Sequence, residues 1–256
     1  MRRIRSILMA TLFLSTLIAG CLSDSPEEYG ITLVVNHENT NGTIVESYAN
    51  GEHVSTTNVS LEFDFSNTFS TEKLVTFGID PNDGRNPILV DPNNETTITV
   101  EFSNHGIYEI NAYAIDELGQ QANIGIVIRK ELTIEWSESN TYEPENLVIN
   151  PIPENGGPSP ILILIDSTVE NPVLIENIGG GQEVEVTWRL VDQQDTACQS
   201  RSGVIHEGDE LNWKTIHFNT YEIHDLRVIY DDGQDYINVN QTVIIVYDTL
   251  ESSPNP

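Results

Sequence analysis

The stretch TITVEFSNHGIYEINAYAIDELG, residues 97–119, decides the fold class of this 256-residue chain. Apolar side chains at residues 98, 100 and 102 alternate with polar ones, and this period of two is typical of half-buried antiparallel strands. Asn104-His105-Gly106 marks a turn, and a second apolar segment ends at the turn Glu117-Leu118-Gly119. The stretch therefore predicts two short strands joined by a tight connection.

The same alternation recurs along the chain on both sides of this stretch. It runs through Leu61, Phe63 and Phe65, through Ile124, Ile126 and Ile128, through Val184, Val186, Trp188 and Leu190, and through apolar segments at 213–218, 221–230 and 239–246. Turn signals such as Pro81-Asn82-Asp83-Gly84 separate these runs, and no helical pattern of a dozen residues is visible. Short strands at this spacing predict an all-β sandwich architecture.

The two halves of the chain resemble each other. Tyr108-Glu109-Ile110 is answered 113 residues later by Tyr221-Glu222-Ile223, and each is followed by an Asp-containing turn with glycine. A polar segment near Asn140 separates the halves. We therefore predict two tandem immunoglobulin-like β-sandwiches at residues 30–136 and 147–249, joined by a linker at 137–146 and followed by a polar tail at 250–256.

Residues 59–128 resemble polycystic-kidney-disease (PKD) and related immunoglobulin-like modules. In these modules Gly-x-Tyr, here Gly106-Ile107-Tyr108, opens a strand that ends in an Asp-rich turn. The resemblance implies that Tyr108 forms a tyrosine corner, whose hydroxyl bonds to backbone upstream. The Trp-Asp-Phe-Gly-Asp-Gly segment of the family is not reproduced, and residues 77–84 stand nearest to it. Such modules commonly serve as extracellular spacers and binding domains, which is the role that the resemblance implies here.

The N-terminus resembles the signal peptide of prokaryotic lipoproteins. Three arginines among the first five residues precede an apolar segment at 7–19, which is shorter than the roughly 20 residues of a spanning helix. Leu17-Ile18-Ala19-Gly20-Cys21 resembles a lipobox. The resemblance implies removal of residues 1–20, a lipid on Cys21, a lipidated tether at 21–29, and a location on the outer face of a membrane in the cell envelope.

The chain is strongly acidic, with 40 Asp and Glu residues against 11 Lys and Arg and a formal net charge of −29. Nucleic-acid binding requires clustered basic side chains, so this charge excludes a nucleic acid as partner. The acidic groups favour solubility in salt, and they leave open the capture of cations.

Few residues offer metal or catalytic chemistry. Asp80, Asn82 and Asp83 are a candidate calcium site because they bring hard oxygen atoms together, although the segment also reads as an ordinary turn without an ion and its spacing differs from the EF-hand. No other cofactor is indicated. The six histidines show no paired spacing, and only His217 and His224 lie near enough to converge. With Cys21 lipidated, Cys198 has no disulfide partner, and we expect it to be buried as a small apolar residue.

No catalytic residue is nominated, since the sequence lacks a Gly-x-Ser-x-Gly nucleophile elbow. We therefore expect a non-enzymatic, lipid-anchored surface protein that acts as a spacer or as a binding module for a protein or a glycan. An accessory or solute-capturing subunit of an envelope complex or transporter is the alternative, and a hydrolase is a third. An exposed aromatic platform or an unpaired sheet edge would favour the first reading. A deep pocket between the halves would favour the second, and carboxylates or histidines that converge in a cleft would favour the third.

Overall fold

A computed structural model describes residues 30–173 and 182–256, and within these residues every regular element is a strand. The prediction of an all-β chain is therefore confirmed. The predicted signal peptide, the lipidation site Cys21 and the tether lie outside the described residues. Among the described residues, no helix is long and apolar enough to cross a membrane.

The strands form one long sheet, one smaller sheet of four strands and two strand pairs. The first half holds β1 (Ile31–Thr32), β2 (Asn41–Ala49), β3 (Glu52–Thr57), β4 (Val59–Asp64), β5 (Phe69–Ser70), β6 (Leu74–Asp80), β7 (Ile88–Val90), β8 (Thr97–Phe102), β9 (Gly106–Asp116) and β10 (Gln121–Thr141). The second half holds β11 (Leu147–Ile149), β12 (Leu162–Glu170), β13 (Val184–Val191), β14 (Ala197–Ile205), β15 (Glu210–His217), β16 (His224–Asp232) and β17 (Ile237–Val246).

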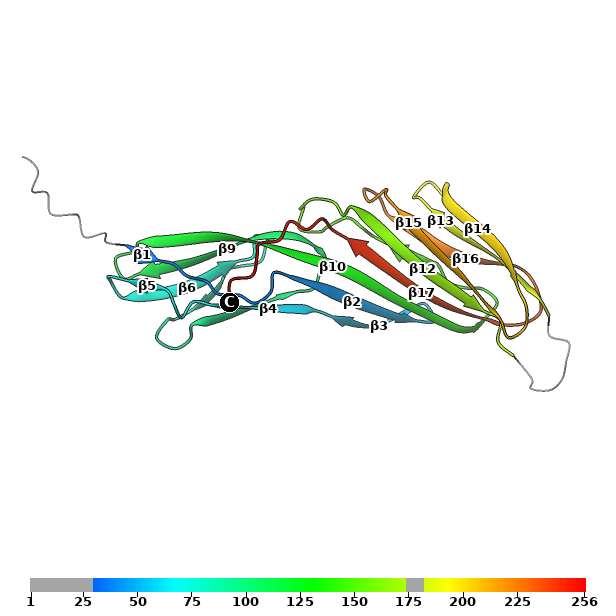
Figure 1. Ribbon diagram of the computed structural model, residues 1–256, viewed down its shortest axis with the longest axis horizontal. Helices are drawn as coiled ribbons and strands as arrows, with labels where there is room; N and C mark the ends of the chain where they lie inside the picture. Colours follow the sequence, from blue (N-terminus) through cyan, green and yellow to red (C-terminus); the bar gives the residue numbers. More distant parts are fainter. Residues whose placement is uncertain (1–29, 174–181) are drawn as a thin grey trace, which may run out of the picture.

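Strand β10 runs through both halves of the elongated molecule (Figure 1). Its first part pairs with β9, and its second part pairs with β17 on the same side and with β2, in parallel, on the opposite side. The long sheet therefore continues from one half to the other in the order β15-β12-β17-β10-β9-β6-β7. Because β10 extends to Thr141, the predicted linker at 137–146 begins inside this strand.

Two hydrophobic cores lie on this sheet, one in each half. The first core packs the apolar side chains of β6, β9 and β10 against those of β4 and β8, and Phe63, Val100 and Ile110 are fully buried in it. The second core packs β10, β12, β15 and β17 against the sheet β11-β16-β13-β14 and includes Trp188. Apolar side chains turn inward at every second residue of these strands because successive side chains of a strand point to opposite faces.

Ile44 of β2 and Trp136 of β10 belong to the second core, although both lie in the segment that the sequence assigns to the first sandwich. Each half is thus a layered β structure, while the proposed separation into two tandem domains stays a prediction. The structure also differs from the sequence pattern at Ile124, which is 44% exposed although its neighbours Ile126 and Ile128 are buried.

The C-terminal tail packs against the first half. The Ser252 backbone N–H donates to the carbonyl oxygen of Val127 (2.9 Å), and Asn255 exchanges two backbone hydrogen bonds with His37. Arg129 forms an ion pair with Glu251 at 2.8 Å. The tail therefore covers the edge of β10 that faces away from β9.

Candidate functional site

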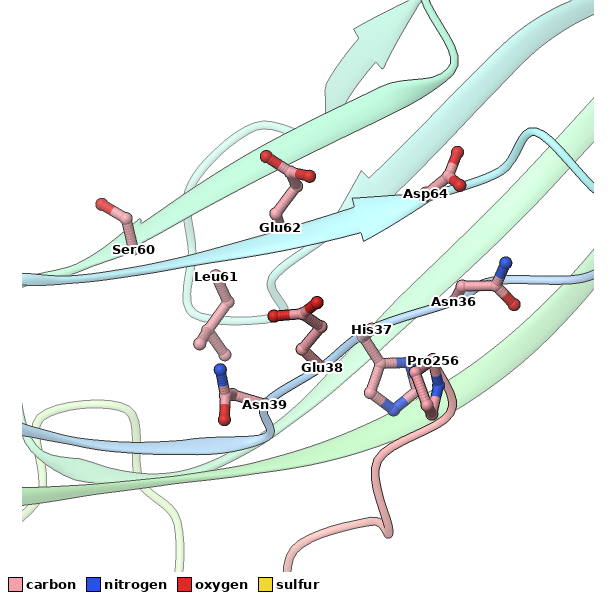
Figure 2. A pocket seen from close by; sticks show the side chains of 9 residues that line it. All are labelled: Asn36, His37, Glu38, Asn39, Ser60, Leu61, Glu62, Asp64 and Pro256. Carbon is pink, nitrogen blue, oxygen red and sulfur yellow. The ribbon is translucent and has the colours of Figure 1, made fainter.

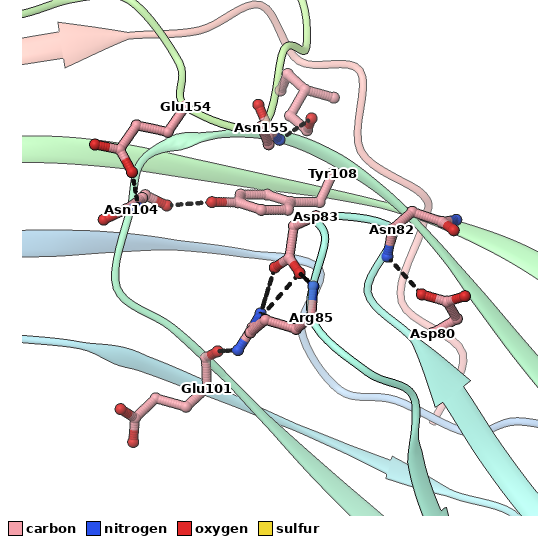
Figure 3. A network of polar contacts seen from close by, with 10 residues as sticks. Asp80, Asn82, Asp83, Arg85, Glu101, Asn104, Tyr108, Glu154 and Asn155 are labelled. Carbon is pink, nitrogen blue, oxygen red and sulfur yellow. Dashed lines mark hydrogen bonds and ion pairs between the residues drawn. The ribbon is translucent and has the colours of Figure 1, made fainter.

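Of the candidate calcium site, Asp80 ends β6 and Asn82 and Asp83 lie in the turn that follows, and all three are engaged with protein partners (Figure 3). The Asp83 carboxylate pairs with Arg85 at 2.6 Å. An Asp80 oxygen accepts the backbone N–H of Asn82 at 2.9 Å, while the Asn82 side chain donates to the Glu109 carbonyl. Arg85 holds the pKa of Asp83 below its ordinary value although burial opposes this. The calcium site stays a prediction.

Tyr108 lies in the same network, and its hydroxyl donates a 2.7 Å hydrogen bond to the carbonyl oxygen of Asn104 (Figure 3). This is the bond that the tyrosine-corner resemblance implies, and it is present. Burial raises the pKa of Tyr108 to about 12, which keeps the hydroxyl a donor. In the second half Tyr221 does not repeat this arrangement, because β16 begins only at His224 and the Tyr221 side chain is 77% exposed in the preceding turn. The predicted equivalence of Tyr108 and Tyr221 is wrong.

A groove of about 450 Å³ lies between β4 and the segment that precedes β2 (Figure 2). Its walls carry the carboxylates of Glu38, Glu62 and Asp64, and Pro256 closes one end beside His37. Among the residues described, these three carboxylates do not gather their oxygen atoms within 4.8 Å of one another. The groove therefore offers separate acceptors for hydrogen bonds instead of a compact set of cation ligands.

A second groove, of about 560 Å³, crosses the second-half part of the long sheet on the face that points away from the core. We call this surface the polar sheet face. Its side chains come from five neighbouring strands: Ser47, Glu135, Ser137, Asn240, Thr242, Asp166, Thr168, Asn212 and Lys214. The strand register lines them up in rows, since Thr242 lies opposite both Glu135 and Asp166, and Asn240 lies opposite both Ser137 and Thr168.

Hydrogen bonds fix one side of the polar sheet face. Lys214 pairs with Asp166 at 2.7 Å, and the Asn212 amide donates to Asp166 and to the Thr168 hydroxyl at 2.5 and 2.8 Å. Lys214, followed by Asn212, lowers the pKa of Asp166 and keeps this carboxyl ionised. In contrast, the side chains of Asn240 and Thr242 are exposed and make no hydrogen bond within residues 30–173 and 182–256. They are thus available to a ligand.

Three tyrosines gather where β17 begins. The rings of Tyr142 and Tyr236 lie 4.5 Å apart, and the Tyr230 ring lies 5.8 Å from that of Tyr142. Tyr142 is 43% exposed and Tyr236 is 39% exposed. The side chains of Asn238, Asn240 and Thr242 point outward from β17, and Tyr236, which directly precedes the strand, continues this alternation. The aromatic pair of Tyr142 and Tyr236 therefore lies at one end of this row of outward-pointing side chains.

Sequence reasoning missed both the polar sheet face and the tyrosine cluster. Their signal is present in the segment 236–242, where tyrosine, two asparagines and threonine occupy alternate positions. A polar residue at such a position is also what any solvent-facing strand shows. Only the pairing of β2, β10, β17, β12 and β15 shows that five such strands place their polar residues side by side.

The expectation for Cys198 is wrong, because the structure places this residue at the surface as a free cysteine. It lies on β14, the edge strand of the smaller sheet, on which most side chains are exposed. The two histidines that could converge do so: the ring centroids of His217 and His224 lie 4.5 Å apart.

The cavity where the two halves meet has a volume of about 280 Å³ and is lined by residues that include Tyr48, His105 and Leu132. Small-molecule sites usually measure roughly 300–1,000 Å³. This cavity lies at the lower limit of that range, and the solute-capturing subunit stays a prediction.

No family model matches this sequence, and no curated protein matches it. Among solved structures, the chain is similar to a carbohydrate-binding module of the β-sandwich superfamily at 10% identity and a TM-score of 0.32, covering 84% of this chain and 97% of that one. It is similar to the Bacteroides ovatus protein SGBP-B of a mixed-linkage glucan utilization locus, in complex with a heptasaccharide, at 10% identity and a TM-score of 0.23, covering 86% and 59%.

A Bacteroides uniformis β-glucuronidase also matches, at 12% identity and a TM-score of 0.27, and there the chain covers 82% of its own length but 30% of the enzyme's. These similarities are distant, since all three TM-scores are below 0.5.

Proposed function

We propose that this protein is a non-enzymatic glycan-binding module, attached to the outer face of a membrane through lipid on Cys21. The observation that carries the proposal is the polar sheet face, which combines exposed amides and hydroxyls with an aromatic pair at the end of the same strand.

Sugars and this surface are complementary in their chemistry. Sugar hydroxyls both donate and accept hydrogen bonds, and the side chains of Asn240 and Thr242 can do both as well. The C–H faces of sugar rings are apolar and pack on aromatic rings such as those of Tyr142 and Tyr236. Because most of the polar groups are carried on paired strands, their spacing is fixed before a ligand binds, which lowers the entropy cost of binding.

The charge of the chain narrows the class of glycan. At a net charge of −29 the surface repels anionic polysaccharides, so neutral glycans are the favoured ligands. Lys214 and Asn212 hold Asp166 ionised, so this carboxyl does not supply the proton-donating acid that a glycosidase needs beside its ionised carboxylate.

Affinity electrophoresis in gels that contain neutral soluble polysaccharides, such as a mixed-linkage β-glucan and a galactomannan, tests the proposal. We expect the protein to be retarded by at least one of them, and Tyr236→Ala and Asn240→Ala to lose most of that retardation. Tyr221→Ala is the matched control, since it also removes an exposed tyrosine but lies away from the face. If no neutral glycan retards the protein, or if Tyr221→Ala weakens retardation as much as Tyr236→Ala does, the proposal is wrong.

The lipid anchor is tested separately. We expect the native protein in the membrane fraction and Cys21→Ser in the soluble fraction, with mass spectrometry showing a diacylglyceryl group on the N-terminal cysteine of the mature chain. An unmodified N-terminal peptide would rule the anchor out without bearing on glycan binding.

A further inference from the structure

His217, His224 and Cys198 meet at one end of the second half, although they come from three different strands. His217 ends β15 in the long sheet, His224 begins β16, and Cys198 lies on β14 in the smaller sheet. One nitrogen atom of each ring and the sulfur atom of Cys198 lie within 4.8 Å of one another. The two rings meet nearly at right angles, with an interplanar angle of 82°.

Each imidazole has a nitrogen atom that is buried without a partner. His224 is 1% exposed and His217 is 8% exposed, and within the described part of the chain neither Nδ1 of His224 nor Nε2 of His217 forms a hydrogen bond. The other nitrogen of His224, Nε2, lies 2.9 Å from the carbonyl oxygen of Asn219. A carbonyl oxygen can only accept, so Nε2 carries the proton and Nδ1 presents a lone pair.

Leaving these buried polar atoms unpaired destabilises the folded state. A cation that takes the lone pair of Nδ1 of His224, and that of Nε2 of His217 in the tautomer with its proton on Nδ1, removes this cost. In a histidine that binds metal, the ring nitrogen that does not contact the metal commonly donates to a backbone carbonyl oxygen. This hydrogen bond fixes the tautomer and the orientation of the ring.

Neighbouring contacts hold the two sheets together beside the cluster. The Gln199 side chain donates to the Ile216 carbonyl at 2.9 Å and accepts from the Thr215 hydroxyl at 2.6 Å, so β14 is tied to β15 next to Cys198. The Thr220 hydroxyl donates to the Pro160 carbonyl at 2.6 Å and anchors the turn between the two histidines. The three side chains are thus presented by a fixed frame.

We propose that Cys198, His217 and His224 form a binding site for one Zn²⁺ ion. Two imidazole nitrogens and a thiolate are ligands that zinc takes up in tetrahedral sites, at about 2.0–2.1 Å for nitrogen and about 2.3 Å for sulfur. Such distances place ligand atoms roughly 3.3–3.6 Å apart. The present separation closes to this value by side-chain rotation, and Cys198 is free to rotate because it is exposed. Water completes the fourth position on the exposed side.

The charges around the cluster favour a cation. Burial of His217 and its contact with His224 disfavour two charged imidazoles at this place, and the neutral ring is the form that binds metal. Burial raises the pKa of the Cys198 thiol, and the carboxylates of Asp192 and Glu222 raise it further. These carboxylates oppose a free thiolate, but they attract a divalent ion, whose own charge then stabilises the thiolate. Because the ligands come from both sheets, the ion also joins the two layers of this half.

Titration of the full-length Cys21→Ser chain with Co²⁺ and Zn²⁺ tests the site, since Cys198 is then its sole thiol. We expect one equivalent of Co²⁺ to give tetrahedral visible bands and a thiolate charge-transfer band, and Zn²⁺ to abolish both by displacement. Adding Cys198→Ala to the Cys21→Ser chain removes the charge-transfer band. It also weakens Zn²⁺ binding, measured by calorimetry, at least tenfold. Adding His217→Gln weakens it to a similar extent.

His206→Gln is the matched control, because His206 is also near a carboxylate, Glu183, but is exposed and is not one of the three clustered side chains. It leaves the Co²⁺ spectrum and the Zn²⁺ affinity unchanged. The unfolding temperature without metal shows whether each variant is folded. The test of the zinc site rests on Cys198→Ala, because the side chain that it removes is exposed. Absence of the charge-transfer band in the parent chain, or a loss of Zn²⁺ affinity of less than tenfold in Cys198→Ala, overturns the proposal. Neither result depends on glycan binding.

Discussion

The ammonium nitrogen of Lys130 lies 5.1 Å from the centre of the Phe102 ring, and within the described residues it forms no hydrogen bond. The Lys130 side chain is fully buried beside the first core. Its contact with the ring face is a cation–π interaction, which offsets only part of the cost of removing the charge from water. Burial, followed by the repulsion of Arg129, lowers the pKa of Lys130 to about 7.

This shift predicts that stability rises with pH. Between about pH 7 and about pH 10.5 the unfolded chain binds a proton at Lys130 that the folded chain has released, so the free energy of unfolding increases across this window, by on the order of 5 kcal/mol. Lys130→Met removes the rise and stabilises the protein below pH 7. Urea unfolding from pH 6 to 10 measures both effects. The exposed Lys73→Met is the control, and an equal slope in parent and Lys130→Met would contradict the prediction.

The pair of Arg129 and Glu251 predicts an acid-sensitive attachment of the C-terminal tail. The hydrogen bond from Arg129 lowers the pKa of Glu251 to about 2 although burial opposes this. The pair therefore stabilises the folded state fully above the ordinary pKa of about 4.5, and this contribution is lost as the pH falls towards 2. At pH 7, Glu251→Gln lowers the free energy of unfolding by about 1 kcal/mol, because the pair is partly solvated.

Chemical unfolding at pH 7 and at pH 2.5 measures this effect. The difference between Glu251→Gln and the parent shrinks at pH 2.5, because the unfolded chain has by then bound a proton at Glu251, whereas the folded chain, with a pKa of about 2, still holds this carboxyl mostly ionised. The exposed Glu117→Gln serves as the control and leaves stability unchanged at both values. A difference that persists at pH 2.5 would show that the charge of Glu251 is not the cause.

The tyrosine corner predicts an asymmetry between the halves. Tyr108→Phe removes the donor to the Asn104 carbonyl and lowers the free energy of unfolding by about 1 kcal/mol. Tyr221→Phe changes it by less than about 0.5 kcal/mol, since this side chain is exposed. Guanidinium unfolding of the two variants compares them directly, and equal losses would contradict the assignment of the corner to Tyr108 alone.

The acidic composition predicts a dependence on salt. With a net charge of −29, repulsion among surface carboxylates destabilises the compact state, and counterions screen this repulsion. The melting temperature of the protein therefore increases from low salt to roughly 1 M NaCl. Calorimetric scans at several NaCl concentrations measure it, with a flat or falling curve as the opposing result.

The sequence by itself determined the all-β class and much of the burial pattern. Alternation assigned Phe63, Val100 and Trp188 to the cores, and these side chains are fully buried. The Gly-x-Tyr motif predicted a tyrosine corner at Tyr108, whose hydroxyl donates to the carbonyl oxygen of Asn104, four residues upstream. These features are local, because the period of a strand and the geometry of a turn are encoded within a few neighbouring residues.

The tertiary structure decided what lies side by side. Strand β10 crosses the predicted boundary near Asn140 because its two parts find different partners, β9 and β17, which alternation alone cannot distinguish. The polar sheet face depends on the register of five strands, and the meeting of Cys198 with His217 and His224 depends on the packing of two sheets. Both are set by contacts between residues far apart in the chain, for which a period of two carries no information.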